Sequence, residues 1–110
     1  MSGYGAVLVT LPVAATNYRM LTLIQAMPGY AQAKSTCREL TIQPNSQNQF
    51  DTLYIGDEAM TGTDFGMIRF VGPPNEVAHY RSDQNNIAMN EMYLRTDAPG
   101  LQVAIQFVYD

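Results

Sequence analysis

The run Leu101–Tyr109 constrains the fold of this chain most strongly. Apolar side chains occupy every second position of it: Leu101, Val103, Ile105, Phe107 and Tyr109. Successive side chains of a β-strand point to opposite faces of the sheet, so a period of two predicts a strand with one buried face. We therefore expect this segment to lie in a sheet, and its truncation to destabilise the domain rather than trim a tail.

Turn residues divide most of the remaining sequence into short strand candidates. The candidates are residues 40–43, 52–55, 67–71, 77–81 and 89–95. The segment Thr96–Gly100 contains Pro99-Gly100, where proline presets φ and glycine supplies a positive φ. Short strands separated by such turns indicate a sandwich or a barrel. We predict an all-β fold, an antiparallel β-sandwich of about six to eight strands that includes the jelly roll among its forms.

The first third of the sequence has a less regular pattern. Residues Ala6–Leu11 are a strand candidate, and Asn17 is placed to cap one short N-terminal helix, Tyr18–Ala26. The spacing of the apolar residues in this second segment leaves helix and strand both open. We divide the chain into residues 1–16, an N-terminal arm or edge strand, and residues 17–110, a single β-sandwich domain.

Charge and composition exclude several classes of function. The net charge is −4 and the six basic residues are scattered, whereas phosphate binding needs clustered Lys and Arg, so we expect no nucleic-acid partner. No run of about 18 apolar residues exists, so we expect no membrane span. The N-terminus lacks the positive region of a signal peptide, which favours synthesis in a cytoplasm without export. A surface poor in Lys and Glu is typical of protein interfaces and favours a homo-oligomer.

Few residues offer catalytic or metal-binding chemistry. Cys37 and His79 are the one Cys and the one His, and nothing in the sequence brings them together. A free Cys in a strand usually behaves as a small apolar residue, so we expect no catalytic pair and no enzymatic activity. Zinc needs more such ligands. Asp57, Glu58 and Asp64 offer hard oxygens to calcium without the spacing of an EF-hand, so we expect a solvated loop, no metal and no cofactor.

The segment between residues 40 and 66 has a recognisable order of parts. A strand candidate is followed by an Asn- and Gln-rich turn, the letters LYIGD, the letters TGTDFG and a further strand candidate. This order resembles small structural proteins of tailed bacteriophage heads, over roughly residues 36–110. The resemblance implies a virion protein made in the host cytoplasm. Within that group it favours a capsid decoration (cement) protein that binds the major capsid protein.

Other functions remain open at this point. The resemblance is also compatible with a head-completion, tail or host-adhesion component of the virion, as an alternative to the favoured decoration protein. A carbohydrate-binding β-sandwich module is a third class, although the chain has no Trp to present to a sugar. A small β-barrel enzyme would require Cys37 and His79 to share a deep polar pocket.

The apolar segment Tyr4–Val13 is the candidate for partner contact. It is either a strand of its own sheet or an arm that adds as a strand to a neighbouring subunit. On the arm interpretation, deletion of residues 1–13 leaves a folded domain with weakened self-association or capsid binding. The contact residues on that interpretation are Tyr4, Val7, Leu8, Val9 and Leu11.

Overall fold

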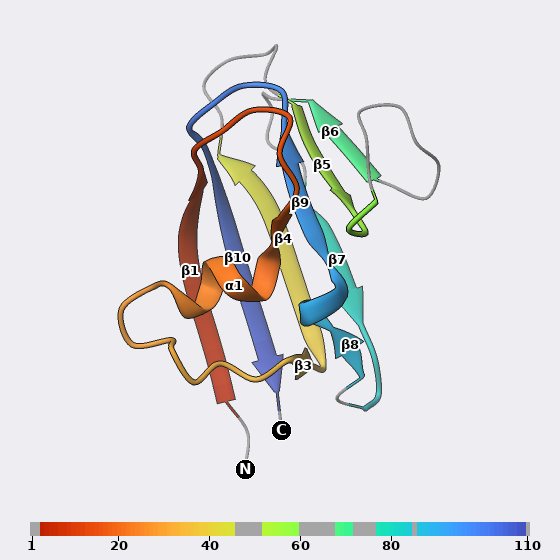
Figure 1. Ribbon diagram of the computed structural model, residues 1–110. Coiled ribbons are helices and arrows are strands. Elements are labelled where there is room, and N and C mark those ends of the chain that lie inside the picture. Colours follow the sequence, from red (N-terminus) through yellow and green to blue (C-terminus); the bar gives the residue numbers. More distant parts are fainter. Residues whose placement is uncertain (1–2, 46–51, 60–67, 72–76, 85, 110) are drawn as a thin grey trace.

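The computed structural model describes residues 3–45, 52–59, 68–71, 77–84 and 86–109 (Figure 1). Two four-stranded sheets dominate it. Sheet A has the strand order β1 (Gly3–Leu11), β10 (Leu101–Tyr109), β4 (Glu39–Asn45) and β7 (Ala78–Arg81). Sheet B has the order β2 (Tyr18–Arg19), β9 (Tyr93–Thr96), β5 (Thr52–Gly56) and β6 (Ile68–Val71). The remaining elements are the helix α1 (Met20–Gln25), the 3-10 helix η1 (Met89–Glu91), and the short strands β3 (Thr36–Cys37) and β8 (Ile87–Ala88), which pair with each other.

The connections between the sheets follow a nested pattern. Every strand pair is antiparallel. Among the eight strands of the two large sheets, the first pairs with the last, the second with the seventh, the third with the sixth and the fourth with the fifth. These pairs alternate between sheet A and sheet B, which is the topology of a jelly roll. The predicted antiparallel β-sandwich is therefore confirmed.

The core lies between the inner face of sheet A on one side and sheet B with α1 on the other (Figure 1). Val103, Ile105 and Phe107 of β10 are buried there, whereas Gln102 and Gln106 between them are exposed. The predicted facing of this strand is confirmed. This strand is an inner strand of sheet A, between β1 and β4.

Two glycines of β1 lie opposite aromatic residues of β10. Gly3 pairs with Tyr109 and Gly5 with Phe107. A Cβ atom at either glycine would overlap the facing ring. Because both positions lack a side chain, the two rings lie across β1 and stack on each other with centroids 6.2 Å apart. A ring packed over a strand glycine compensates for the apolar area that the glycine does not supply.

The predicted helix Tyr18–Ala26 is shorter than expected. Its first two residues form β2, which pairs with β9, and α1 begins only at Met20. Asn17 does not cap the helix: its Nδ2 donates to the carbonyl oxygen of Glu58 at 3.1 Å, and its Oδ1 accepts from Arg95 Nη1 at 3.3 Å. Tyr18 and Arg19, which the sequence pattern assigned to the first helical turn, thus pair with β9 of sheet B instead.

The predicted strand at residues 89–95 is also interrupted. Residues Met89–Glu91 form η1, and β9 begins at Tyr93. Met89 is fully buried, and its backbone N–H donates to the Ser35 carbonyl oxygen at 2.9 Å. This turn places the apolar Met89 side chain against α1, where it is buried. In a straight strand, successive side chains would point to opposite faces of the sheet. The candidates at residues 40–43, 52–55 and 77–81 agree with the structure to within about two residues at their ends, as does the described part of 67–71, whose residue 67 lies outside the described residues. The candidate Ala6–Leu11 begins three residues too late, since β1 starts at Gly3.

The N-terminal segment is a strand of its own sheet. Residues Gly3–Leu11 pair with β10 along their whole length, and Val7, Val9 and Leu11 are buried. This placement agrees with the strand interpretation and argues against a domain that stays folded without residues 1–13. Their removal would take three side chains from the core and leave one edge of β10 without its partner.

Candidate interaction surface

The solvent-facing side of sheet A is a broad surface, which we call the A face. In Figure 1, α1 and sheet B lie in front of sheet A, so the A face is on the far side. Alternate positions of the strands supply its side chains. They are Tyr4, Ala6, Leu8 and Thr10 of β1; Gln102, Ala104, Gln106 and Val108 of β10; Glu39, Thr41, Gln43 and Asn45 of β4; and His79 and Arg81 of β7.

Most of the A face carries no charge. Its apolar part is at β1, where the side chains of Tyr4 and Leu8 are 64% and 43% exposed. Its charged groups are confined to one corner on β4 and β7. There Glu39 Oε1 lies 3.6 Å from His79 Nε2, and Glu39 is opposite Arg81 in the register. The described residues of β1 and β10 on this face are apolar, hydroxyl or amide side chains.

The edge of β1 is covered in its middle by Tyr30. The Tyr30 hydroxyl accepts from the backbone N–H of Ala6 and donates to the carbonyl oxygen of the same residue, both at 3.3 Å. The ring packs edge-on against Phe107, at 6.0 Å between centroids and 72° between planes. An edge strand whose backbone groups are bonded by its own chain offers fewer groups to a foreign strand. Tyr30 therefore opposes strand addition at this point of β1.

The structure separates the five contact residues predicted from the sequence into two groups. Tyr4 and Leu8 are on the A face, and Val7, Val9 and Leu11 are in the core. The buried three could reach a partner only if β1 left its sheet. The sequence pattern treated the segment as one apolar run, whereas alternation along the strand divides it.

Sequence reasoning missed the contribution of β10 to this surface. Ala104 and Val108 lie beside Leu8 and Tyr4 in the register and continue the apolar area of β1. Gln102 and Gln106 are the exposed amides between them. The signal was present, because these four residues are the positions that alternate with the buried side chains of the C-terminal strand.

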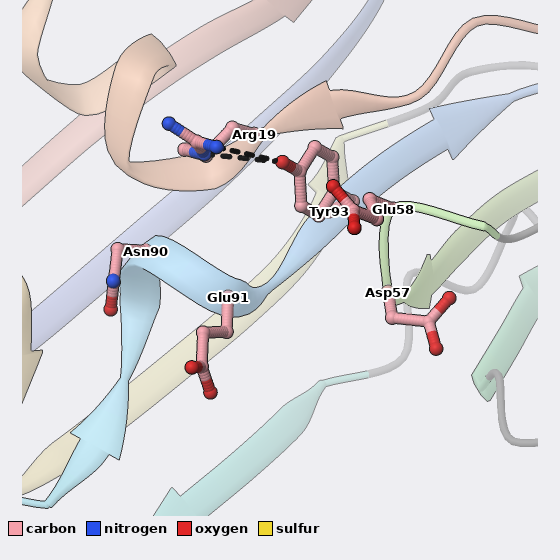
Figure 2. A pocket seen from close by; sticks show the side chains of 6 residues that line it. All are labelled: Arg19, Asp57, Glu58, Asn90, Glu91 and Tyr93. Atoms are coloured by element: carbon pink, nitrogen blue, oxygen red, sulfur yellow. Dashed lines mark hydrogen bonds between the residues drawn. The ribbon is translucent and has the colours of Figure 1, made fainter.

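An open hollow of about 510 Å³ is a second surface feature (Figure 2). It is lined by Arg19, Asp57, Glu58, Asn90, Glu91 and Tyr93. Arg19 donates to the Tyr93 hydroxyl from Nε at 3.2 Å and from Nη2 at 3.0 Å, and its guanidinium lies 5.7 Å from the centre of that ring. Asp57 Oδ1 accepts from the backbone N–H of Ala59 at 3.0 Å. Three carboxylates and one guanidinium make the hollow polar and net acidic.

Cys37 and His79 lie in different environments. Cys37 is fully buried, and this burial raises the pKa of its thiol from 9.0 to about 11. The thiol is therefore protonated, and poorly nucleophilic, at neutral pH. His79 is on the A face beside Glu39, with more than half of its side chain exposed. The structure encloses the sulfur in the core and leaves the imidazole in solvent.

The candidate calcium ligands are only partly described. Asp57 and Glu58 line the hollow, and Asp64 lies outside the described residues. Within the described part of the chain, no group of three or more His, Cys, Asp or Glu side chains is arranged to hold a metal ion. Among the same residues, no helix has the length and apolar character to cross a membrane.

Comparisons with known proteins give likenesses of structure only. No family model matches the sequence, and no curated protein does. The coat protein of Tobacco streak virus, solved as a dimer, superposes with a TM-score of 0.44 at 15% identity, over 93% of this chain and 85% of that one. A protein of Bacillus endospore appendages, a family of disulfide-linked pili, superposes with a TM-score of 0.44 at 11% identity, over 100% of this chain and 88% of that one. These values do not support a transfer of function.

Proposed function

We propose that this protein is a non-enzymatic structural subunit of a tailed-phage virion, which decorates the capsid and stabilises it by binding the major capsid protein. The proposal joins the sequence resemblance to the one observation that carries it, the A face. Sheet A offers a surface four strands wide whose charged side chains are confined to one corner, with Tyr4 and Leu8 exposed beside uncharged amides.

The composition of the A face supports a role in contact rather than in solvation. The core of a protein interface is depleted of Lys, Glu and Asp, and exposed tyrosine is a frequent anchor there. Copies that bind a repeating lattice also need little affinity each, because many weak contacts act together. A small domain with one face that is uncharged outside a single corner meets these requirements.

The test is co-sedimentation with shells assembled from the major capsid protein of the same genome. We expect the purified protein to pellet with the shells at a fixed copy number and to raise their disassembly temperature. The variant Cys37→Ala should bind as the parent protein does, because its sulfur is buried in the core. A protein that stays in the supernatant at every concentration, with folded shells present, would contradict the proposal.

The hollow favours glycan binding as a second candidate function. Its carboxylates, the Asn90 amide and the Tyr93 ring are groups that bind sugar hydroxyls and sugar faces, although Arg19 lies over that ring. A glycan array probed with the isolated domain tests this candidate. Binding that is lost in Asn90→Ala and Tyr93→Ala, and kept in Gln106→Ala on the A face, would support a role in host adhesion. An array without signal would remove it.

A further inference from the structure

We infer that the partner of the A face is a second copy of this chain, placed by a two-fold axis so that the two A faces pack on each other. This inference rests on the proposed structural role: two copies cover the A face for each other, and the pair meets the capsid through the surface that remains outside the A faces. Three properties of the A face favour a second copy: its charge, its hydrogen-bonding groups and its size.

The distribution of charge favours self-contact at this face. Two copies of a chain with net charge −4 repel each other unless their contact surfaces lack that charge. Of the described carboxylates, Asp57, Glu58 and Glu91 gather in the hollow, away from the A face. Glu39 is on the A face, but it lies beside His79 and opposite Arg81. A basic partner would instead be attracted to the hollow.

The polar side chains of the A face can form hydrogen bonds with the same kind of side chain on a second copy. A two-fold contact sets one patch against its own copy, so a patch of one charge sign would face the same sign. An amide side chain carries both donors and an acceptor, and can therefore pair with another amide. Gln102 and Gln106 of β10, with Asn45 of β4, give the A face three such groups.

The A face is close to the size that a specific contact requires. Its strands have nine, nine, seven and four residues, which at ~3.4 Å per residue and a strand spacing of ~4.8 Å give about 470 Å² of flat area. Two copies thus cover about 950 Å² of flat area, near the lower bound of about 1,000 Å² for a specific interface. Tyr4 and Leu8, extended by Val108 and Ala104, supply its apolar part.

The alternative way to join two such sheets is edge to edge through β1. The Tyr30 hydroxyl opposes it, because a strand added there would have to displace both of its bonds to Ala6. Face-to-face packing leaves those bonds intact. The two arrangements therefore respond differently to a change at Tyr30.

The experiment is sedimentation velocity of the full chain over a range of concentrations up to about 1 mM, so that a dimer with a dissociation constant in the millimolar range is still detected. Ala104 lies at the centre of the A face between Leu8 and Gln43 in the register. We expect a dimer for the parent protein and a dissociation constant raised at least about tenfold in Ala104→Arg and in Gln106→Arg. Asn90→Arg is the matched control in the hollow and should dimerise normally.

Thermal melts of each variant identify any loss of fold. If Ala104→Arg does not fold, Gln106→Arg alone tests the A face. Tyr30→Phe should dimerise as the parent protein does; stronger association in this variant would point to the β1 edge and overturn the inference. A parent protein that is monomeric throughout, or folded A-face variants that still dimerise, would also overturn it. Co-sedimentation with shells tests capsid binding separately from dimerisation. A monomeric protein that binds shells would overturn only the dimer, and a dimer that does not bind shells would overturn only the proposed function.

Discussion

The contact between Gly5 and Phe107 shows how one missing side chain shapes the core. The ring covers the glycine and reaches Tyr30, whose hydroxyl bonds the backbone of Ala6. A methyl group at residue 5 would force Phe107 aside and disturb this series of contacts. The effect would extend from the core to the outer edge of β1.

We predict that Gly5→Ala lowers the free energy of unfolding by about 1–3 kcal/mol, the usual cost of overpacking a filled core. Urea denaturation measures it. The double variant Gly5→Ala/Phe107→Leu should lose less than the sum of the two single variants, because the smaller side chain leaves room for the methyl group. Strict additivity would show that the ring and the glycine do not interact in this way.

Cys37 makes stability depend on pH in a defined window. The pKa of its thiol is raised to about 11 in the folded chain by burial. Between pH 9 and 11 the unfolded thiol has lost its proton and the folded one keeps it, so the free energy of unfolding falls as pH rises. The full loss is about 2–3 kcal/mol.

The check is urea denaturation from pH 7.5 to pH 10.5, in the parent protein and in Cys37→Ala. We expect the parent protein to lose more stability over this window than the variant. Partial burial also raises the pKa of Tyr80, but that residue is present in both proteins and cancels in the comparison. Parallel curves would contradict the contribution of the buried thiol.

At the scale of elements, β10 allows a matched pair of substitutions. Ile105 is fully buried and Gln106 is exposed on the A face. Ile105→Asp should unfold the domain because it buries an unpaired charge, and Gln106→Asp should change the free energy of unfolding by less than about 1 kcal/mol. Circular dichroism melts of both variants measure this. Equal tolerance at the two positions would show that the strand faces the other way.

The strand β1 is the second element with a direct test. Deletion of residues 1–13 should leave a chain that does not melt cooperatively, since Val7, Val9 and Leu11 belong to the core. A milder variant, Tyr4→Ser/Leu8→Ser, should melt within a few degrees of the parent protein, because both side chains are on the surface. A deletion variant with a normal melt would revive the arm interpretation.

The sequence predicted those elements whose pattern is local. The alternation of Leu101–Tyr109 identified β10 and its buried face, because burial on one side of a strand acts on neighbouring residues. The helix α1 was predicted too early in the chain because β2 pairs with β9, a contact between distant segments. The A face could not be predicted as a unit for the same reason. It joins Leu8 to Ala104 only through the pairing of β1 with β10.

At the scale of the whole molecule, the two sheets differ in what they offer to other molecules. Sheet A presents a broad face with a small, internally compensated charge, and the acidic hollow lies among β9, η1 and the end of β5 on the other side. A shell subunit and a second copy of this chain could therefore bind one domain without competing for the same residues. Two separate contact surfaces on one domain would suit a protein that connects neighbouring positions of a lattice.

The nested pairing of strands also determines when this domain can fold. In sheet A, β10 is an inner strand and the last of the described strands in chain order, and both β1 and β4 form hydrogen bonds to it. During translation the first strand must therefore wait for residues some hundred positions later, and the loops closed by that pairing are the longest the domain contains. A ribosome-bound chain that stops before Leu101 exposes the apolar side chains of β1 and β4 without their partner. Folding of this domain is therefore expected to wait until β10 has left the ribosome, rather than to proceed strand by strand.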